Sequence, residues 1–481
     1  MKLHHLLLAF GLSAGLGSAA KLPLLIEANE DVSAMFPGAP KIHSFVSAEW
    51  EGKWIFIAGR MAGYHGDGGK DADFPRAGAN TSVWVVEPPQ GNRAAKTYSL
   101  AVSKLPANLA LVRDQWMSSN PEAVQVGETL YITGGYGQNS EGKWVTYPVL
   151  SSVHLPSLVK AVMGQVSFAD LRIQYVQSEA VQVSGGELVR LDDGMFYLVG
   201  GHKFMGSYRD FEAGGERNSG TVSQVYTSAI RKLKIDAAPL AVTLVEEFAD
   251  PEFRRRDLNV ALTIGADGKS LGAAAFGGVF TAAQLGFSKP VYWNAKERPK
   301  TEAGFDQKMS AYTCAHVGFF DPDQGQMLTT FFGGISGWLW SDEKSDFAPA
   351  PKEGEKSSAT YRDGLQWIDR ITTVARNRDG SHLEMVQAEN RLGGYVGANG
   401  VFLPVANLGK IRPDADVFDL RPLKGKRTLI GYLFGGIRAF PRQFPYRDDS
   451  PDYRSGNVPT RASELVLAVY LTASKAPAIS E

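Results

Sequence analysis

Six short apolar runs in this chain each end at a pair of glycines or at a close variant of one. The runs end at Ala58-Gly59, Gly134-Gly135, Gly200-Gly201, Gly277-Gly278, Gly333-Gly334 and Gly435-Gly436. Each run predicts a buried β-strand that stops at a backbone turn which glycine tolerates best. Because this element recurs six times, we predict an all-β chain with one repeat for each blade of a β-propeller.

Further strands complete each repeat, and the last repeat lacks one of them. Paired apolar runs with polar connectors occur at 82–87 with 96–100, 228–233 with 240–244, and 371–375 with 383–386. Each pair predicts the outer half of a four-stranded blade. Only one run, at 464–471, follows Gly436. A strand at 22–26 would supply the missing outer strand, so we predict a six-bladed ring closed by its N- and C-terminal strands.

The N-terminus has the pattern of an export signal. Lys2 precedes an apolar run at 6–16, and small residues at 18–20 provide a cleavage site. We therefore predict a signal peptide at 1–20, a propeller at 21–481, and a periplasmic or secreted protein. No later stretch is long and apolar enough to predict a membrane span. The formal net charge of −1 gives no case for nucleic acid as a partner.

The glycine pairs and the strand order together resemble the bacterial exported kelch-repeat proteins of the periplasm and cell surface, in the galactose-oxidase-like superfamily. The resemblance covers about 21–481 and implies a kelch-type propeller. The chain departs from the family pattern at Ala58-Gly59-Arg60, and its loops are longer than usual.

Candidate ligand-binding residues cluster around one face of the predicted ring. In a blade, the segment that leaves each glycine pair and the segment that leads into each innermost strand lie on the same face. These segments hold Arg60, His65, Tyr136, His202, Arg209, Arg256, Asp257 and Arg438. Guanidinium groups suit carboxylates and phosphates, and aromatic rings suit the apolar faces of sugars. We expect a glycan, a small anionic ligand or a protein partner there; alternatively, the arginines pair with nearby aspartates and hold the loops.

A second hypothesis is a carbohydrate mutarotase or epimerase. It rests on a loose resemblance to periplasmic kelch proteins that handle sialic acid. Such chemistry needs a general acid or base and a cationic clamp. Glu216 and Arg217 are the candidate pair, and Arg60 and Arg438 would complete the clamp.

A third hypothesis is a copper-dependent oxidoreductase resembling galactose oxidase. Tyr312, Cys314 and His316 alternate along one predicted strand, so they share a face if the strand is regular. Imidazole suits copper, yet no local spacing here specifies a copper site. As the only cysteine, Cys314 forms no internal disulfide and is also typical of a buried apolar position.

No cofactor is otherwise expected, although calcium has one candidate position. The acidic, glycine-rich stretch from Asp67 to Asp73 offers oxygen ligands close together in sequence. It lacks the spacing and the terminal glutamate of a calcium loop, so a solvated turn is the competing interpretation.

Overall fold

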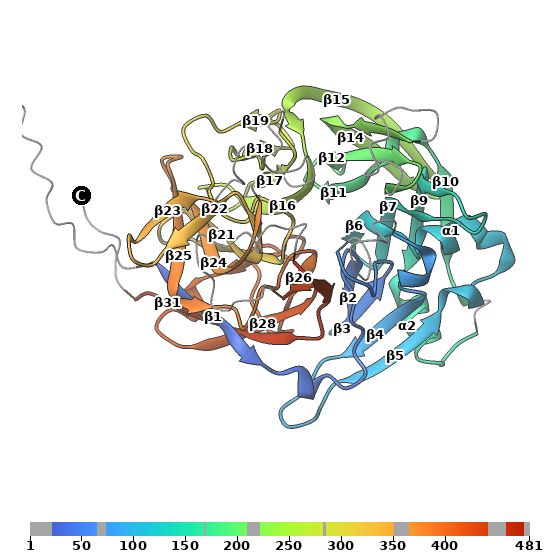
Figure 1. Ribbon diagram of the computed structural model, residues 1–481, viewed down its shortest axis with the longest axis horizontal. Helices are drawn as coiled ribbons and strands as arrows, with labels where there is room; N and C mark the ends of the chain where they lie inside the picture. The colour runs from blue at the N-terminus through green and yellow to red at the C-terminus, as the bar shows by residue number, and fades with distance from the viewer. Residues whose placement is uncertain are drawn as a thin grey trace, which may run out of the picture.

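Six antiparallel sheets stand around a central axis, as Figure 1 shows for this computed structural model. The structure describes residues 22–64, 74–167, 170–208, 222–281, 285–350, 365–440 and 458–475. In each sheet a path of four strands runs outward from the axis. The predicted six-bladed β-propeller is confirmed.

The first three blades follow one another along the chain. Blade 1 contains β2 (Val46–Trp50), β3 (Lys53–Ile57), β4 (Ser82–Glu87) and β5 (Lys96–Ala101). Blade 2 contains β6 (Ser119–Val126), β7 (Thr129–Gln138), β8 (Trp144–Thr146), β9 (Val149–His154) and β10 (Ile173–Gln177). Blade 3 contains β11 (Ser184–Arg190), β12 (Phe196–Met205), β13 (Ser223–Tyr226), β14 (Ser228–Ala237) and β15 (Leu240–Arg254). Helices α1 (Ala110–Gln115) and α2 (Leu155–Val162) pack into the apolar core that joins blades 1 and 2.

The remaining blades complete the ring. Blade 4 contains β16 (Arg256–Ile264), β17 (Leu271–Val279), β18 (Val291–Asn294) and β19 (Lys300–Thr301). Blade 5 contains β20 (His316–Asp321), β21 (Gln326–Ser336), β24 (Gln366–Arg376) and β25 (His382–Arg391). Blade 6 contains β26 (Gly400–Pro404), β28 (Thr428–Gly435), β31 (Val466–Ala473) and β1 (Leu24–Asp31). Two hairpins, β22 (Trp338–Ser341) with β23 (Asp346–Pro349) and β29 (Ile437–Ala439) with β30 (Thr460–Ala462), form separate small sheets.

The two ends of the chain close the ring in blade 6. Strand β1 is the outermost strand and pairs antiparallel with β31, from Leu24 opposite Ala473 to Asp31 opposite Leu467. The Ile26 side chain is fully buried. Blade 5 also holds β1, because the buried Gln387 amide donates to the Leu24 carbonyl at 3.1 Å. The predicted closure by N- and C-terminal strands is confirmed.

The glycine pairs join each blade to the next. All twelve residues of the six pairs, Ala58 included, have positive φ. The second glycine of each pair donates its backbone N–H to a carbonyl just before the innermost strand of the following blade, for example Gly278 to Ala311 at 2.6 Å and Gly436 to Ile42 at 2.8 Å. All six pairs make this bond. The glycine pairs that mark the repeats in the sequence therefore also make the contacts that set the spacing between blades.

Glycine is required at these turns for a steric reason as well. A Cβ atom on Gly277 would lie 2.5 Å from the Ala311 carbonyl oxygen, and one on Gly435 would lie 2.6 Å from the Ile42 oxygen. Side chains at these points would force neighbouring blades apart, since the opposing atoms belong to the backbone.

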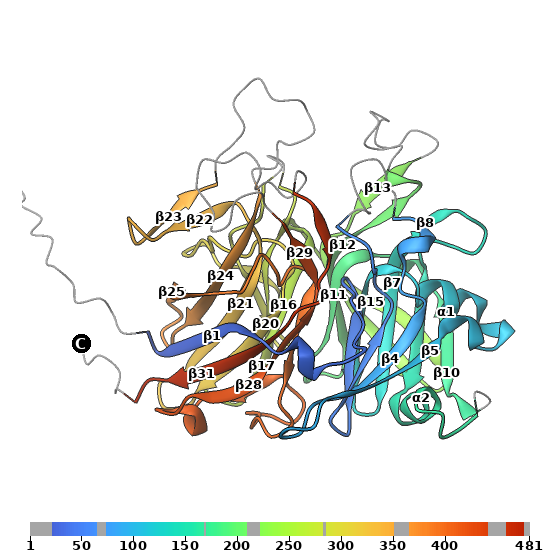
Figure 2. The same cartoon turned by 60° about the horizontal axis from the view of Figure 1, so that its bottom comes forward.

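The two faces of the ring are built differently. Figure 2 shows β8, β13, β22, β23 and β29 together on one face, here named the upper face. On the opposite face, the connection between β26 and β28 contributes β27 (Val417–Asp419), which pairs in parallel with the innermost strand β20. Arg412 of this connection binds Asp192 of blade 3 at 2.6 Å. This connection therefore crosses the lower end of the channel.

Candidate functional site

A collar of short residues, all polar except one glycine, lies at the upper end of the channel. Its six members stand where each blade leads into its innermost strand, and they are Ser44, Asn120, Gly185, Asp257, Thr313 and Asn399. All except Thr313 have positive φ, between 49° and 69°. Asparagine, aspartate and glycine adopt this conformation most readily. Several members are joined from blade to blade by backbone hydrogen bonds, such as Asn120 N–H to the Ser44 carbonyl and Asn399 N–H to the Thr313 carbonyl.

Two cavities meet at this collar. Below it the channel encloses about 820 Å³. Above it lies a small polar cavity of about 40 Å³, here named the channel-mouth pocket. Besides collar residues, its lining includes Tyr64, Phe74, Ser119, Tyr136, Ser184, His202, Tyr208, Arg256 and Tyr312. Since a cavity needs about 10–15 Å³ on this measure to hold one water, the pocket has room for a carboxylate-sized group.

Arg256 is the cationic group of the channel-mouth pocket. Its guanidinium donates to the Tyr208 hydroxyl at 2.7 Å and lies over the Phe280 ring at 5.2 Å. The Nε atom is 3.6 Å from the nearest Asp257 carboxylate oxygen, an ion pair too long for a hydrogen bond. Nε is buried and has no hydrogen-bond partner among the described residues. Its side chain is 15% exposed, and the carboxylate beside it makes an ion pair without a hydrogen bond.

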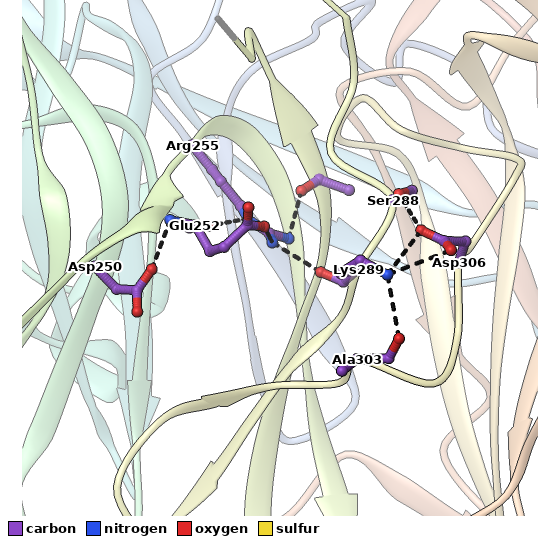
Figure 3. A network of polar contacts seen from close by, with 8 residues as sticks. Asp250, Glu252, Arg255, Ser288, Lys289, Ala303 and Asp306 are labelled. Atoms are coloured by element: carbon purple, nitrogen blue, oxygen red, sulfur yellow. Dashed lines mark hydrogen bonds and ion pairs between the residues drawn. The ribbon is translucent and has the colours of Figure 1, made fainter.

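The preceding arginine has a different role. Arg255 does not line the pocket and belongs instead to the network that Figure 3 shows. Its guanidinium donates to the carbonyls of Gly277 at 3.0 Å and Lys289 at 2.7 Å, and its carbonyl accepts from Gly201. Arg255 therefore ties blades 3 and 4 together. This anchoring presents Arg256 to the channel mouth.

His202 is held as a neutral imidazole. Burial, and then the neighbouring Arg256 charge, lowers the pKa of His202 well below its usual value. Its Nε2 lies 3.5 Å from an Arg256 nitrogen, and its Nδ1 lies 2.8 Å from the Gln224 amide. The histidine therefore supplies polar contacts to the pocket without adding a second positive charge.

Asp257 balances the arginine and closes the collar. Its carboxylate accepts from the Asn120 amide at 3.0 Å, across the position of Gly185. A Cβ atom on Gly185 would lie 2.9 Å from the same carboxylate oxygen. Glycine at this position therefore allows side chains of blades 2 and 4 to meet.

Aromatic rings form the outer wall of the pocket. Tyr208 stacks on Phe204 with ring centres 4.3 Å apart, and Tyr136 lies edge-on to both. The Tyr136 hydroxyl donates to the Gly206 carbonyl at 2.7 Å. Burial raises the pKa of Tyr208, so its hydroxyl stays protonated. The wall therefore offers ring faces and phenol groups beside one guanidinium.

Four of the eight ligand-binding candidates come together here, namely Tyr136, His202, Arg256 and Asp257. Two others lie elsewhere. Arg60 is buried with its guanidinium over Phe74 at 5.0 Å, and Arg438 pairs with Glu464 beside the β29–β30 hairpin.

Several predictions fall outside the described residues. They concern the signal peptide at 1–20, His65, Arg209, Glu216, Arg217 and the stretch from Asp67 to Asp73. Export, the mutarotase or epimerase alternative and the calcium site therefore stay predictions.

The proposed copper ligands contact different neighbours. Tyr312 lines the channel-mouth pocket, whereas Cys314 and His316 both line the channel, and Cys314 also packs in an apolar cluster with Phe276 and Phe331. Burial raises the pKa of Cys314 to about 12. The His316 ring nitrogens approach the carbonyls of Cys314 and Val260 at 3.0 and 3.3 Å. Regular strand begins only at His316, and the described residues hold no group of three His, Cys, Asp or Glu arranged for a metal. Neither observation concerns a site with a tyrosine ligand, so the copper alternative stays a prediction.

Three collar residues, Asn120, Asp257 and Asn399, lie in the predicted entries to the innermost strands, whereas Ser44, Gly185 and Thr313 were not predicted as site residues. Ser44 was detectable in principle, because a short polar residue precedes the innermost strand in several repeats. Phe74 and Ser184 carry no such local signal.

Comparisons with known proteins give a structural likeness but no family. No protein-family model matches the chain, and no curated protein matches it. A solved structure named "Structure of YjhT" is similar over 89% of this chain and 96% of that chain, with 12% identity and a TM-score of 0.45. The blades and glycine pairs described above define this protein as a six-bladed β-propeller. Among the described residues, no helix is long and apolar enough to cross a membrane.

Proposed function

We propose that the protein binds the anionic end group of a glycan or another small ligand in the channel-mouth pocket. Arg256 is the observation that carries the proposal, since its guanidinium faces a polar cavity and is only partly matched by Asp257. Arginine recognises carboxylates through charge-assisted hydrogen bonds.

The size and charge of the pocket restrict which ligands can bind there. About 40 Å³ admits an end group and not a whole sugar, so the rest of the ligand would lie against the upper face. Arg256 and Asp257 cancel one another formally, and His202 is neutral. A singly charged carboxylate therefore suits the pocket better than a doubly charged phosphate, because a buried surplus charge is costly. The aromatic wall would contact the apolar part of the ligand.

The proposal is tested by calorimetric titration of uronic acids, sugar phosphates and neutral hexoses into the native protein and into Arg256→Gln. A charge-assisted hydrogen bond is worth about 1.5–3 kcal/mol, so the variant should bind a uronic acid about 10- to 150-fold more weakly. Arg438→Gln is the matched control, because Arg438 lies on the upper face and pairs with Glu464 outside the pocket. Equal weakening by both variants, or unchanged binding by Arg256→Gln in a folded protein, would exclude this site.

A further inference from the structure

A second cavity lies on blade 5, beside the β22–β23 hairpin of the upper face that Figure 2 shows. Its volume is about 190 Å³, and it shares no lining residue with the channel-mouth pocket. Residues of β22, β24 and β25 surround it, together with Met309. It is therefore an independent feature of the fold.

A β-bulge directs two adjacent charged side chains into this cavity. On β24, Ile371 pairs with Phe332 and Ile368 pairs with Gly334, so Asp369 and Arg370 together oppose one residue of β21. Consecutive residues of a regular strand point to opposite faces, whereas a bulge redirects one of them. Both Asp369 and Arg370 line the cavity, and each side chain is only 5% exposed.

Four charged groups form a closed, neutral cycle along the cavity wall. Asp342 accepts from Arg370 at 2.6 Å and from Arg391 at 2.5 Å. Asp369 lies 3.3 Å from Arg391 and 3.9 Å from Arg370. The two arginines and two aspartates cancel in charge. An arginine carries five N–H donors and a carboxylate about four acceptor positions, so this cycle leaves hydrogen-bonding capacity for a ligand.

The floor of the cavity is apolar, and an indole ring lies on its wall. Met309, Leu339 and Ile368 are buried beneath it. Trp340 lies on the wall and is fixed edge-on to Phe347, with ring centres 5.1 Å apart. Its Nε1 atom is buried without a hydrogen-bond partner in the described part of the chain.

We propose that this cavity binds one neutral, hydroxyl-rich ring of the chemical class of a hexose. Hydroxyl groups donate to Asp342 and Asp369 and accept from Arg370 and Arg391, while the apolar face of the ring lies against Trp340. Glu343 also lines the cavity, so its wall carries three carboxylates and two guanidinium groups, which favours a neutral ligand over an anionic one. The volume lies below the roughly 300–1,000 Å³ of sites for drug-sized molecules, which limits the occupant to a single ring.

The test is titration of glucose, galactose, mannose and N-acetylglucosamine, followed by calorimetry and tryptophan fluorescence. We expect saturable binding of at least one sugar with a dissociation constant of about 1 mM. Trp340→Ala should weaken that binding at least about tenfold. Trp340→Phe keeps an aromatic ring on the wall, so it should weaken the binding less than Trp340→Ala. Trp338→Ala is the matched control, because Trp338 belongs to the same hairpin but does not line the cavity.

Three results would overturn the proposal. They are the absence of saturable binding for all four sugars, equal affinity in the native protein and a folded Trp340→Ala variant, and equal losses in the Trp338 and Trp340 variants. Arg256→Gln separates this site from the channel-mouth pocket: it should leave hexose binding unchanged. A hexose that no longer binds to Arg256→Gln would be assigned to the channel mouth instead.

Discussion

Replacing Gly277 by alanine tests how the blades are joined. At φ 58° an alanine costs about 1–2 kcal/mol more than in a right-handed conformation. Its Cβ atom would also lie 2.5 Å from the Ala311 oxygen and 2.8 Å from the Ala311 Cα. Relieving that contact must move the backbone that accepts the 2.6 Å bond from Gly278, a bond worth about 0.5–1.5 kcal/mol. The free energy of unfolding should therefore fall by about 2–3 kcal/mol.

Gly52→Ala is the control for the backbone conformation alone. Gly52 has φ 71°, and a Cβ atom there would have no neighbour within 4 Å. Both variants change the unfolded chain in the same way. Urea unfolding of the two should therefore differ by the contact between blades, about 1 kcal/mol or more. Losses that agree within about 0.5 kcal/mol would show that this contact contributes nothing and would refute the steric explanation of the glycine pairs. Because Tyr312 follows Ala311 and lines the channel-mouth pocket, Gly277→Ala should also weaken ligand binding.

Two further predictions concern ring closure and the channel. Ile26→Ala should lower the free energy of unfolding in urea by about 2–4 kcal/mol, because Ile26 is fully buried. Leu25→Ala is the control and should cost about 0.5 kcal/mol or less, because the Leu25 side chain is 44% exposed. Equal losses in the two variants would argue against the packing of β1. Burial, and then the Asp257 charge, raises the pKa of Glu187 in the channel to about 8. The native state thus favours protonated Glu187, and this stabilisation is complete near pH 4 and disappears as the pH rises through about 8. The free energy of unfolding of Glu187→Gln, relative to that of the native protein, should therefore be higher at pH 8.5 than at pH 5. Urea unfolding of both proteins at the two pH values measures this. A relative stability that is the same at both pH values would contradict the assignment.

The blade number was predictable because its signals are local. Each glycine pair needs two successive positive φ values, and this requirement is visible in the residue type itself. Ring closure followed from counting, since the last repeat lacked a strand and the N-terminal run at 22–26 had no partner. The structure confirms both and extends that strand to Asp31.

The site was predictable only in part. The expected strand order of a blade placed Tyr136, His202, Arg256 and Asp257 on one face of the ring, and these residues do line one pocket. It could not separate them from Arg438, which lies on the same face but pairs with Glu464.

The sequence by itself determined the strands, the glycine turns and the order of the blades, because these depend on backbone conformation and on the alternation of buried residues over a few positions. Tertiary structure alone decided which side chains share a cavity. Arg255 and Arg256 are chemically identical neighbours, yet one joins two blades and the other faces the channel mouth. The bulge at Asp369 and Arg370 and the parallel strand β27 depend likewise on partners far away in the chain. The local sequence does not specify those partners, because they come into contact only in the closed ring.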